Sequence, residues 1–139
     1  MTTISAVESA TGQNHAWPIE VRLSKDKRRL TVSFDEGTVH VLDAEYLRVE
    51  SPSAEVQGHS PSERKFIGGK SAVEIIGIDL VGHYAVRLTF DDLHSSGIFS
   101  WDYLYELGRD RKVRWNRYLE GLAAAGGSRE RAKLAKAAS

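Results

Sequence analysis

Apolar and polar residues alternate most clearly over residues 84–90, YAVRLTF, where a large apolar residue stands at every second position. A period of two predicts a strand with one buried face. Asp91 and Asp92 follow directly, and acidic residues favour turns over strands. The sequence therefore predicts a strand that ends in an acidic turn.

A helical pattern begins shortly afterwards. Ser100 follows a short apolar pair and stands where a helix N-cap is expected. Trp101, Leu104 and Leu107 then fall on roughly one helical face, and Gly108 is suited to end the turn. We therefore expect a short strand at 98–99 and a helix that starts after Ser100 and stops at Gly108.

Further apolar runs predict strands at 19–23, 30–34, 38–42 and 73–81. Asp35-Glu36-Gly37 suits a hairpin between the second and third of these, because glycine tolerates a positive φ. His40 is expected on the outer face of its strand, in a structural or solvent-facing role. The run at 73–81 is expected to pair antiparallel with 84–90.

The C-terminal part predicts a second helix. Trp115, Tyr118, Leu119 and Leu122 recur at i, i+3, i+4 and i+7, and Gly126-Gly127 marks the end of the helix. The predicted fold class is α+β: a mainly antiparallel sheet of five to seven short strands with two C-terminal helices packed on it. We expect a single domain at 17–125, a disordered N-terminal tail at 1–16 and a basic, solvated tail at 126–139.

Composition removes several classes of site. The 139 residues include no cysteine, which excludes disulfides, thiolate zinc sites and cysteine nucleophiles. The first residues carry neither the basic nor the apolar segment of a secretion signal, and no apolar run is long enough to span a membrane. A cytoplasmic protein is the expectation.

The net charge of zero conceals an asymmetry. Residues 1–108 hold 10 Lys/Arg and 16 Asp/Glu, whereas residues 109–139 hold 9 and 3. A basic end can bind nucleic acid or an acidic partner, but it is more often a solvated helix face. Weak nucleic-acid binding by the basic C-terminal helix is therefore kept only as an alternative, because no RNA- or DNA-binding motif accompanies it.

The motifs of common enzyme classes are absent. The sequence has no phosphate-binding P-loop, no dinucleotide fingerprint, no H-E-x-x-H and no G-x-S-x-G. Serine catalysis is disfavoured, since a nucleophile needs a positioned base and none is evident. His94, in a polar loop after Asp91 and Asp92, is the residue best placed for chemistry, as a metal ligand or an acid/base group. The simpler interpretation is a loop histidine that hydrogen-bonds a nearby carbonyl or carboxylate.

Six separated segments form a recognisable series of landmarks. They are Trp17-Pro18-Ile19, Phe34-Asp35-Glu36-Gly37, Tyr46-Leu47-Arg48-Val49, Ser51-Pro52-Ser53-Ala54-Glu55-Val56, Val81-Gly82-His83-Tyr84-Ala85, and Asp91-Asp92-Leu93-His94 through Gly97-Ile98-Phe99-Ser100-Trp101. In this order they resemble the gamma-butyrobetaine-hydroxylase-like N-terminal domain family, once catalogued as a domain of unknown function. The resemblance covers roughly residues 17–123 and is to the standalone bacterial form.

The resemblance implies an accessory role. Members are small bacterial proteins or N-terminal domains, some fused to 2-oxoglutarate-dependent oxygenases and others linked to P-loop ATPases of iron–sulfur cluster assembly. In one branch the domain holds a structural zinc through three cysteines and a histidine. The matching positions are Ser51, Ser53, Val56 and His94, so the Cys₃His site cannot form here.

A different metal site is the alternative that this departure leaves open. His94, His59, Asp91 and Asp92 supply nitrogen and oxygen ligands, which suit iron or zinc. The leading hypothesis is a non-enzymatic accessory or protein-interaction domain with no cofactor, linked to iron–sulfur cluster assembly or to a partner oxygenase. A protein partner is expected, and exposed edge strands would also allow a homodimer.

Overall fold

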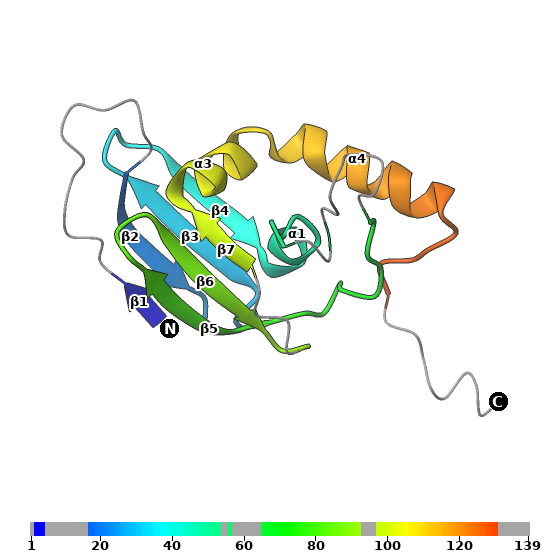
Figure 1. The fold of residues 1–139 in the computed structure, drawn as a ribbon, viewed down its shortest axis with the longest axis horizontal. Helices are drawn as coiled ribbons and strands as arrows, with labels where there is room; N and C mark the ends of the chain where they lie inside the picture. Colours follow the sequence, from blue (N-terminus) through cyan, green and yellow to red (C-terminus); the bar gives the residue numbers. More distant parts are fainter. Residues whose placement is uncertain (1, 5–16, 54–55, 57–64, 93–96, 131–139) are drawn as a thin grey trace.

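Two antiparallel sheets and three helices make up the part of the chain that the computed structural model describes, residues 2–4, 17–53, 56, 65–92 and 97–130. The first sheet has the order β1 (Thr2–Ile4), β2 (Pro18–Leu23), β3 (Arg29–Phe34) and β4 (Val39–Asp43). The second has the order β5 (Ile75–Val81), β6 (Ala85–Phe90) and β7 (Gly97–Ser100). The helices are α1 (Ala44–Val49), α3 (Trp101–Arg109) and α4 (Arg111–Ala124). In Figure 1, α3 and α4 run along the top of the molecule and α1 lies below α4.

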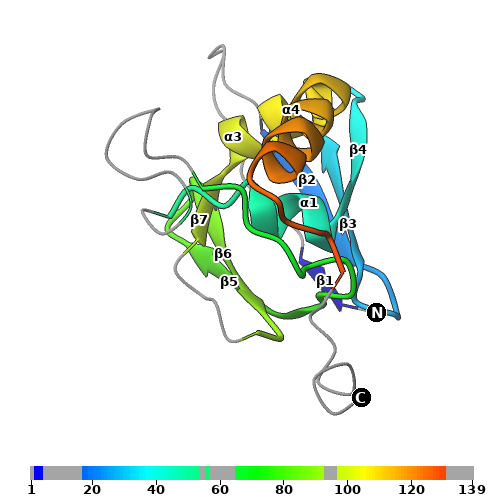
Figure 2. The same ribbon diagram turned by 90° about the vertical axis from the view of Figure 1, so that its right-hand side faces the viewer.

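The predicted α+β class is confirmed, and so are the two C-terminal helices. The predicted antiparallel pairing of the last two long apolar runs is also confirmed, with Ile78 opposite Leu88 and Val81 opposite Ala85. The strands divide between two sheets, and α1 lies between them with α3 and α4 above (Figure 2).

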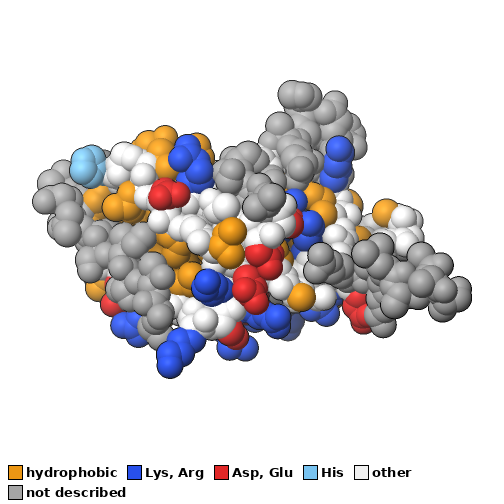
Figure 3. Space-filling model, turned by 90° about the horizontal axis from the view of Figure 1, so that it is seen from below, with side chains coloured by type: hydrophobic (Ala, Val, Ile, Leu, Met, Phe, Trp, Pro, Cys, Tyr) orange, Lys and Arg blue, Asp and Glu red, His pale blue; other side chains and the backbone are white. Residues whose placement is uncertain are grey.

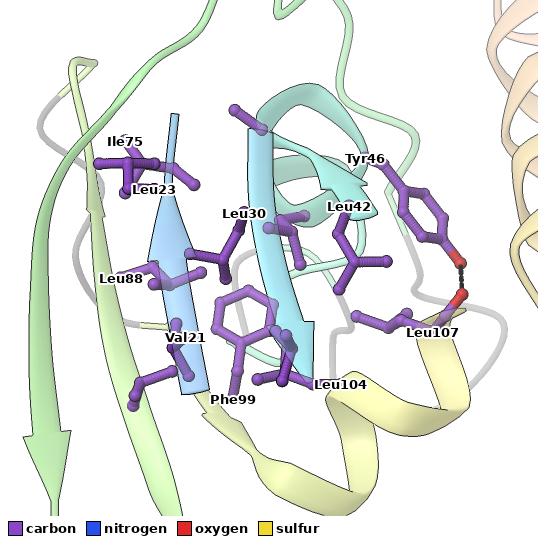
Figure 4. Close-up of a cluster of buried hydrophobic side chains, with 14 of the residues drawn as sticks. Val21, Leu23, Leu30, Leu42, Tyr46, Ile75, Leu88, Phe99, Leu104 and Leu107 are labelled. Carbon is purple, nitrogen blue, oxygen red and sulfur yellow. Dashed lines mark hydrogen bonds between the residues drawn. The ribbon is translucent and has the colours of Figure 1, made fainter. Parts of the chain in front are cut away.

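The core fills the space between the two sheets. Leu30, Val32 and Phe34 of β3 are fully buried, as their alternation predicts. Side chains of both sheets and of α3 meet there (Figure 4) and include Val21, Leu23, Leu42, Ile75, Leu88, Phe99, Leu104 and Leu107. At the edge of this cluster the Tyr46 hydroxyl donates to the carbonyl of Leu107 at 2.7 Å, which ties α1 to α3.

Helix α3 begins as predicted and ends later than predicted. Ser100 is its N-cap, and its Oγ accepts from the backbone N–H of Tyr103 at 3.0 Å. The prediction that Gly108 ends the helix was wrong, since the helix continues to Arg109. Gly108 instead gives room to His40, because a Cβ at this position would lie 2.1 Å from the His40 Cγ.

Strand β4 presents the opposite face from the one expected. His40 was predicted on the outer face, yet its ring packs against Phe34 and Tyr105, with centroids 6.1 and 5.4 Å away. Val39 and Val41 are the exposed residues, at 56% and 43%. Leu42 lies opposite Leu30 and faces the core. His40, two positions earlier, therefore faces the core as well.

Both predicted tails contain ordered segments. Thr2–Ile4 form β1 and pair with β2, although residues 1–16 were predicted to be disordered. At the other end, the backbone N–H of Gly69 donates to Ser128 at 2.8 Å and that of Ser71 to Arg129 at 3.0 Å. Of the tail expected at 126–139, Gly126 to Glu130 are exposed, and the carbonyls of Ser128 and Arg129 tie this segment to residues 69–71. Residues 5–16 and 131–139 lie outside the described part.

Candidate functional site

The two acidic residues predicted at the end of β6 have separate partners. Asp91 accepts a hydrogen bond from the backbone N–H of Glu74 at 3.1 Å. Asp92 accepts from Arg48 Nε at 2.9 Å and from Lys70 Nζ at 2.5 Å. Both acids line a cavity of about 250 Å³ together with Gly69, Lys70, Ala72 and Val73. This cavity therefore contains two of the predicted site residues.

The chemistry of this cavity differs from that of a metal cage. The carboxylate of Asp92 already forms ion pairs with two cationic side chains, and Arg48 is itself only 4% exposed. A metal ion at Asp92 would have to compete with both, or sit beside their charge. Within the described ranges, no three His, Asp or Glu side chains are grouped so that they could hold a metal ion. His94 and His59 lie outside these ranges, so the predicted ligand set remains a prediction.

The positions that match the family's zinc cysteines are buried. Ser51, Ser53 and Val56 are at most 8% exposed, and the Ser51 and Ser53 hydroxyls lie 3.2 Å apart within hydrogen-bonding distance. A Cβ on Gly97 would lie 2.7 Å from Ser51 Oγ, so this segment packs directly on the start of β7. His94, the fourth matching position, lies outside the described residues. Hydroxyls stand where thiolates would be needed, and a hydroxyl is a poor zinc ligand.

Sequence reasoning missed a set of buried charges around α1. Glu45, Arg48 and Glu50 are 8%, 4% and 0% exposed. Such burial is costly unless each charge is paired and hydrogen-bonded. Each of the three has a partner from a distant part of the chain, and the partner of Arg48 is Asp92 in the cavity described above.

The partners of the two glutamates come from the C-terminal region. Arg114 donates to Glu50 at 3.0 Å, and Arg117 lies 3.4 Å from the same oxygen. Arg129 donates to both carboxylate oxygens of Glu45, at 2.7 and 2.8 Å. The hydrogen bond to Glu45 raises the pKa of Arg129, which keeps this guanidinium charged. The charge asymmetry of the sequence was the signal of this arrangement, since the basic C-terminal residues bind acidic residues of α1.

His40 is a further titratable group, and its side chain is half-buried. Its Nε2 is buried and has no hydrogen-bond partner among the residues described. Burial lowers the pKa of His40, although the nearby Glu36 carboxylate opposes this effect. The imidazole is therefore held in its neutral form, between the aromatic rings of Phe34 and Tyr105.

A second hollow lies where α3 meets α4. It has a volume of about 480 Å³ and is lined by Gly108, Arg109, Arg111, Lys112, Trp115 and Asn116. Arg111 also reaches the carbonyl of Val41 at 3.4 Å, so the hollow adjoins β4. All of its charged lining side chains are basic, which suits an acidic group rather than a metal ion.

Comparison with known proteins places this geometry in a family. The model of the family described as gamma-butyrobetaine hydroxylase-like, N-terminal, matches residues 21–105, more than half of the chain. The chain belongs to this family. The resemblance to this family is thereby confirmed. The matched range contains five of the six landmark segments, all but Trp17-Pro18-Ile19, and includes Ser51, Ser53, Asp91 and Asp92.

Solved structures agree with the family assignment. Two proteins with solution NMR structures are 44% and 39% identical to this chain, both with a TM-score of 0.73. The alignments cover 86% and 91% of this chain and 94% of each of those chains. A crystal structure from Acidithiobacillus ferrooxidans, described as a protein of unknown function in the DUF971 family, is 37% identical. Its TM-score is 0.55, with 66% of this chain and 91% of that chain covered. No curated protein matches this chain.

The sequence predicts no segment that spans a membrane. None of the helices in the described segments has the length and apolar character needed to cross a bilayer.

Proposed function

We propose that this protein is a non-enzymatic accessory domain that acts by binding another protein. The observation that carries the proposal is the placement of its exposed apolar side chains. Among the residues that the structure describes, the large apolar side chains that are at least one-third exposed are Ile19, Val39, Val41, Ile76, Leu80, Tyr84, Ile98 and Val113. Four of these eight lie on β4 and β5, each of which is the last strand of its sheet. Apolar side chains on an unpaired edge are a usual route to binding another chain.

The buried charges support a structural rather than a catalytic use of the polar residues. Glu45, Arg48 and Glu50 fix α1 between the sheets and the C-terminal helices through the ion pairs described above. A catalytic acid or base needs contact with substrate, whereas these groups face partners within the chain. This arrangement supports a domain whose ionic residues specify its fold.

The family resemblance supplies the two partner classes to test first. One is the P-loop ATPase class of iron–sulfur cluster assembly, and the other is the 2-oxoglutarate-dependent oxygenase class. The full chain would be titrated into a purified member of each class by isothermal titration calorimetry. We expect saturable binding to one of them, and weaker binding for the double variant Val41→Glu, Leu80→Glu. Lys25→Glu, a charge change at an exposed turn, serves as the matched control.

Two results would contradict the proposal. One is turnover of a small-molecule substrate by the chain alone that is lost in His94→Ala, because that would make the protein an enzyme. The other is binding that the control Lys25→Glu weakens as much as the double variant does, since this would place recognition outside the exposed apolar side chains.

A further inference from the structure

The open side of β4 lies next to a basic hollow, and together they form one continuous surface. We name it the β4 edge groove and define it by Val39, Val41, Arg109, Arg111 and Lys112. Gly108 of the hollow packs on His40, which stands between the two valines. Arg111 of the hollow reaches the carbonyl of Val41 at 3.4 Å. The strand edge and the hollow are therefore parts of one site.

The hydrogen-bond register shows which backbone groups of β4 face outward. The backbone N–H of Phe34 donates to the carbonyl of Thr38 at 2.8 Å, so these two residues are a hydrogen-bonded pair. Bonded and non-bonded pairs alternate along an antiparallel ladder. Val39 and Val41, opposite Ser33 and Thr31, therefore fall at non-bonded positions, and their N–H and C=O groups point away from β3. The contact of Arg111 with the Val41 carbonyl agrees with this direction.

The edge lacks the devices that usually block strand pairing. In the described part of the chain β4 pairs with β3 alone, and its sequence VHVL has no proline and no charged residue before Asp43. Native edges are commonly protected by charge, proline or a bulge. Arg111 is the only side chain shown bonded to this edge among the described residues, and 3.4 Å is long for such a hydrogen bond. An incoming strand could replace it.

We propose that the β4 edge groove binds an extended acidic segment of a partner protein, which adds a strand beside β4. The partner's backbone would bond the outward groups of Val39 and Val41, and its alternate side chains would cover the two valines. Its acidic side chains would face Arg111 and Lys112, since Arg109 is already paired with Asp110. This inference rests on the proposed function and names the chemistry of the partner.

Charge favours this occupant over two others. Strand β4 of a second copy offers a single acidic side chain, Asp43, whereas the hollow presents three basic ones. A nucleic acid would use only the cations, yet Arg109 is bound to Asp110 at 2.9 Å, and Arg114 and Arg117 are bound to Glu50. The lining of the hollow carries basic charge alone, whereas the face shown in Figure 3 carries both acidic and basic side chains.

The test uses a seven-residue acetylated peptide of alternating valine and glutamate, titrated into the full-length ¹⁵N-labelled chain. A peptide of alternating valine and lysine is the ligand control. We expect the acidic peptide to bind and to shift the amide signals of Val39 and Val41. Val41→Pro removes an outward N–H while leaving the ladder to β3 intact, so it should weaken binding by about tenfold or more. Arg111→Glu should do the same.

Matched variants keep the test specific. Val41→Thr retains a β-branched side chain and the backbone N–H, and Lys25→Glu makes the same charge change as Arg111→Glu far from the groove. Lys25→Glu should bind the peptide as the unaltered chain does. Val41→Thr loses some apolar contact but keeps the backbone N–H, so it should bind the peptide more tightly than Val41→Pro. Thermal unfolding of each variant checks that it is folded, and Arg111→Glu supplies an independent test if Val41→Pro does not fold.

Several outcomes would overturn the inference. These are equal binding of the acidic and lysine peptides, binding unchanged in Val41→Pro and Arg111→Glu, a dimer in sedimentation that Val41→Pro dissociates, or Arg111-dependent binding of oligo-dT in place of the peptide. If the peptide fails while a partner enzyme still binds Val41→Pro in the calorimetric titration, the proposed function stands and the β4 edge groove is the wrong surface.

Discussion

The Arg129 guanidinium donates hydrogen bonds of 2.7 and 2.8 Å to both carboxylate oxygens of Glu45, a residue 84 positions earlier in the chain. The guanidinium also lies over the ring of Trp115, 5.3 Å from its centroid. Because Glu45 is almost fully buried at the start of α1, its charge depends on a partner that comes from the end of the described chain. The C-terminal segment is thereby part of the domain.

Replacement of Arg129 by alanine should destabilise the protein. The variant leaves the buried Glu45 carboxylate without its bidentate partner, and we expect the free energy of unfolding to fall by about 1–3 kcal/mol. Urea unfolding followed by circular dichroism measures this change. Glu130→Ala, next to it and exposed, is the control and should change little. If Arg129→Ala lowers the free energy of unfolding no more than Glu130→Ala does, the ion pair makes no net contribution to stability. A double-mutant cycle with Glu45→Gln would separate the energy of the Arg129–Glu45 pair from that of each residue's other contacts.

Replacement of Gly108 by alanine tests the close approach of α3 to β4. In an exposed helix this change normally stabilises by about 1 kcal/mol, because alanine is the better helix former. Here the added Cβ would meet the His40 ring, so we expect a loss of about 1–3 kcal/mol from overpacking. The same change made in a His40→Ala background should cost much less, as measured by thermal unfolding. A stabilising effect in the unaltered background would show that the ring can move aside.

The buried hydroxyl of Tyr118 should make the protein sensitive to alkali. It donates to the carbonyl of Ile67 at 2.6 Å, and burial raises its pKa to about 12. The pKa of an unfolded tyrosine is about 10, so the unfolded chain loses its phenolic proton first. The stability that this hydroxyl contributes is complete below pH 10 and is lost as the pH rises towards 12.

Tyr118→Phe measures this contribution. Its free energy of unfolding should depend less on pH between 10 and 12 than that of the unaltered chain, although it should be lower near neutral pH because the hydrogen bond to Ile67 is gone. Tyr84→Phe is the matched control, since Tyr84 is 59% exposed. Parallel pH profiles of Tyr118→Phe and the unaltered chain would refute the assignment.

Metal content tests the predicted ligand set directly. The engagement of Asp92 by Arg48 and Lys70 leads us to expect less than stoichiometric iron or zinc in protein purified without chelator or affinity-tag metal. Elemental analysis gives the content, and a thermal-shift assay with Zn²⁺ or Fe²⁺ gives the response. A stoichiometric metal that disappears in His94→Ala, His59→Ala or Asp91→Asn would restore the metal-binding hypothesis.

Local patterns in the sequence were sufficient for the local structure. The strand at 85–90, the cap at Ser100 and the turn at Gly37, where φ is 102°, each depend on residues close in sequence. Which face of β4 is buried could not be predicted from the pattern. Burying His40 and Leu42 exposes Val39 and Val41, whereas burying the two valines exposes Leu42, so either choice leaves an apolar residue exposed. The direction of β4 is set by Leu42 opposite Leu30 in the core.

The candidate site was predictable only as a turn. The acidic pair Asp91-Asp92 ends its strand as expected, but its partners Glu74, Arg48 and Lys70 come from elsewhere in the chain. Helix α1 is buried on all sides, so a helical period cannot distinguish its charged residues from a solvated face. The only sign of these ion pairs in the sequence was the excess of acidic residues before position 109 and of basic residues after it. The same excess of basic residues would also be compatible with nucleic-acid binding, so it did not identify the partners.

The dependence of α1 on the C-terminal arginines has a consequence for synthesis on the ribosome. The β2–β4 meander and α1 emerge first, with Glu45 and Glu50 uncompensated until Arg114, Arg117 and Arg129 have been translated. Unpaired carboxylates cannot be buried at low cost, so we expect α1 to dock weakly in the nascent chain. We expect the domain to reach its full stability only once Arg129 has been translated, and a product cut short before this residue to be digested more readily by proteases.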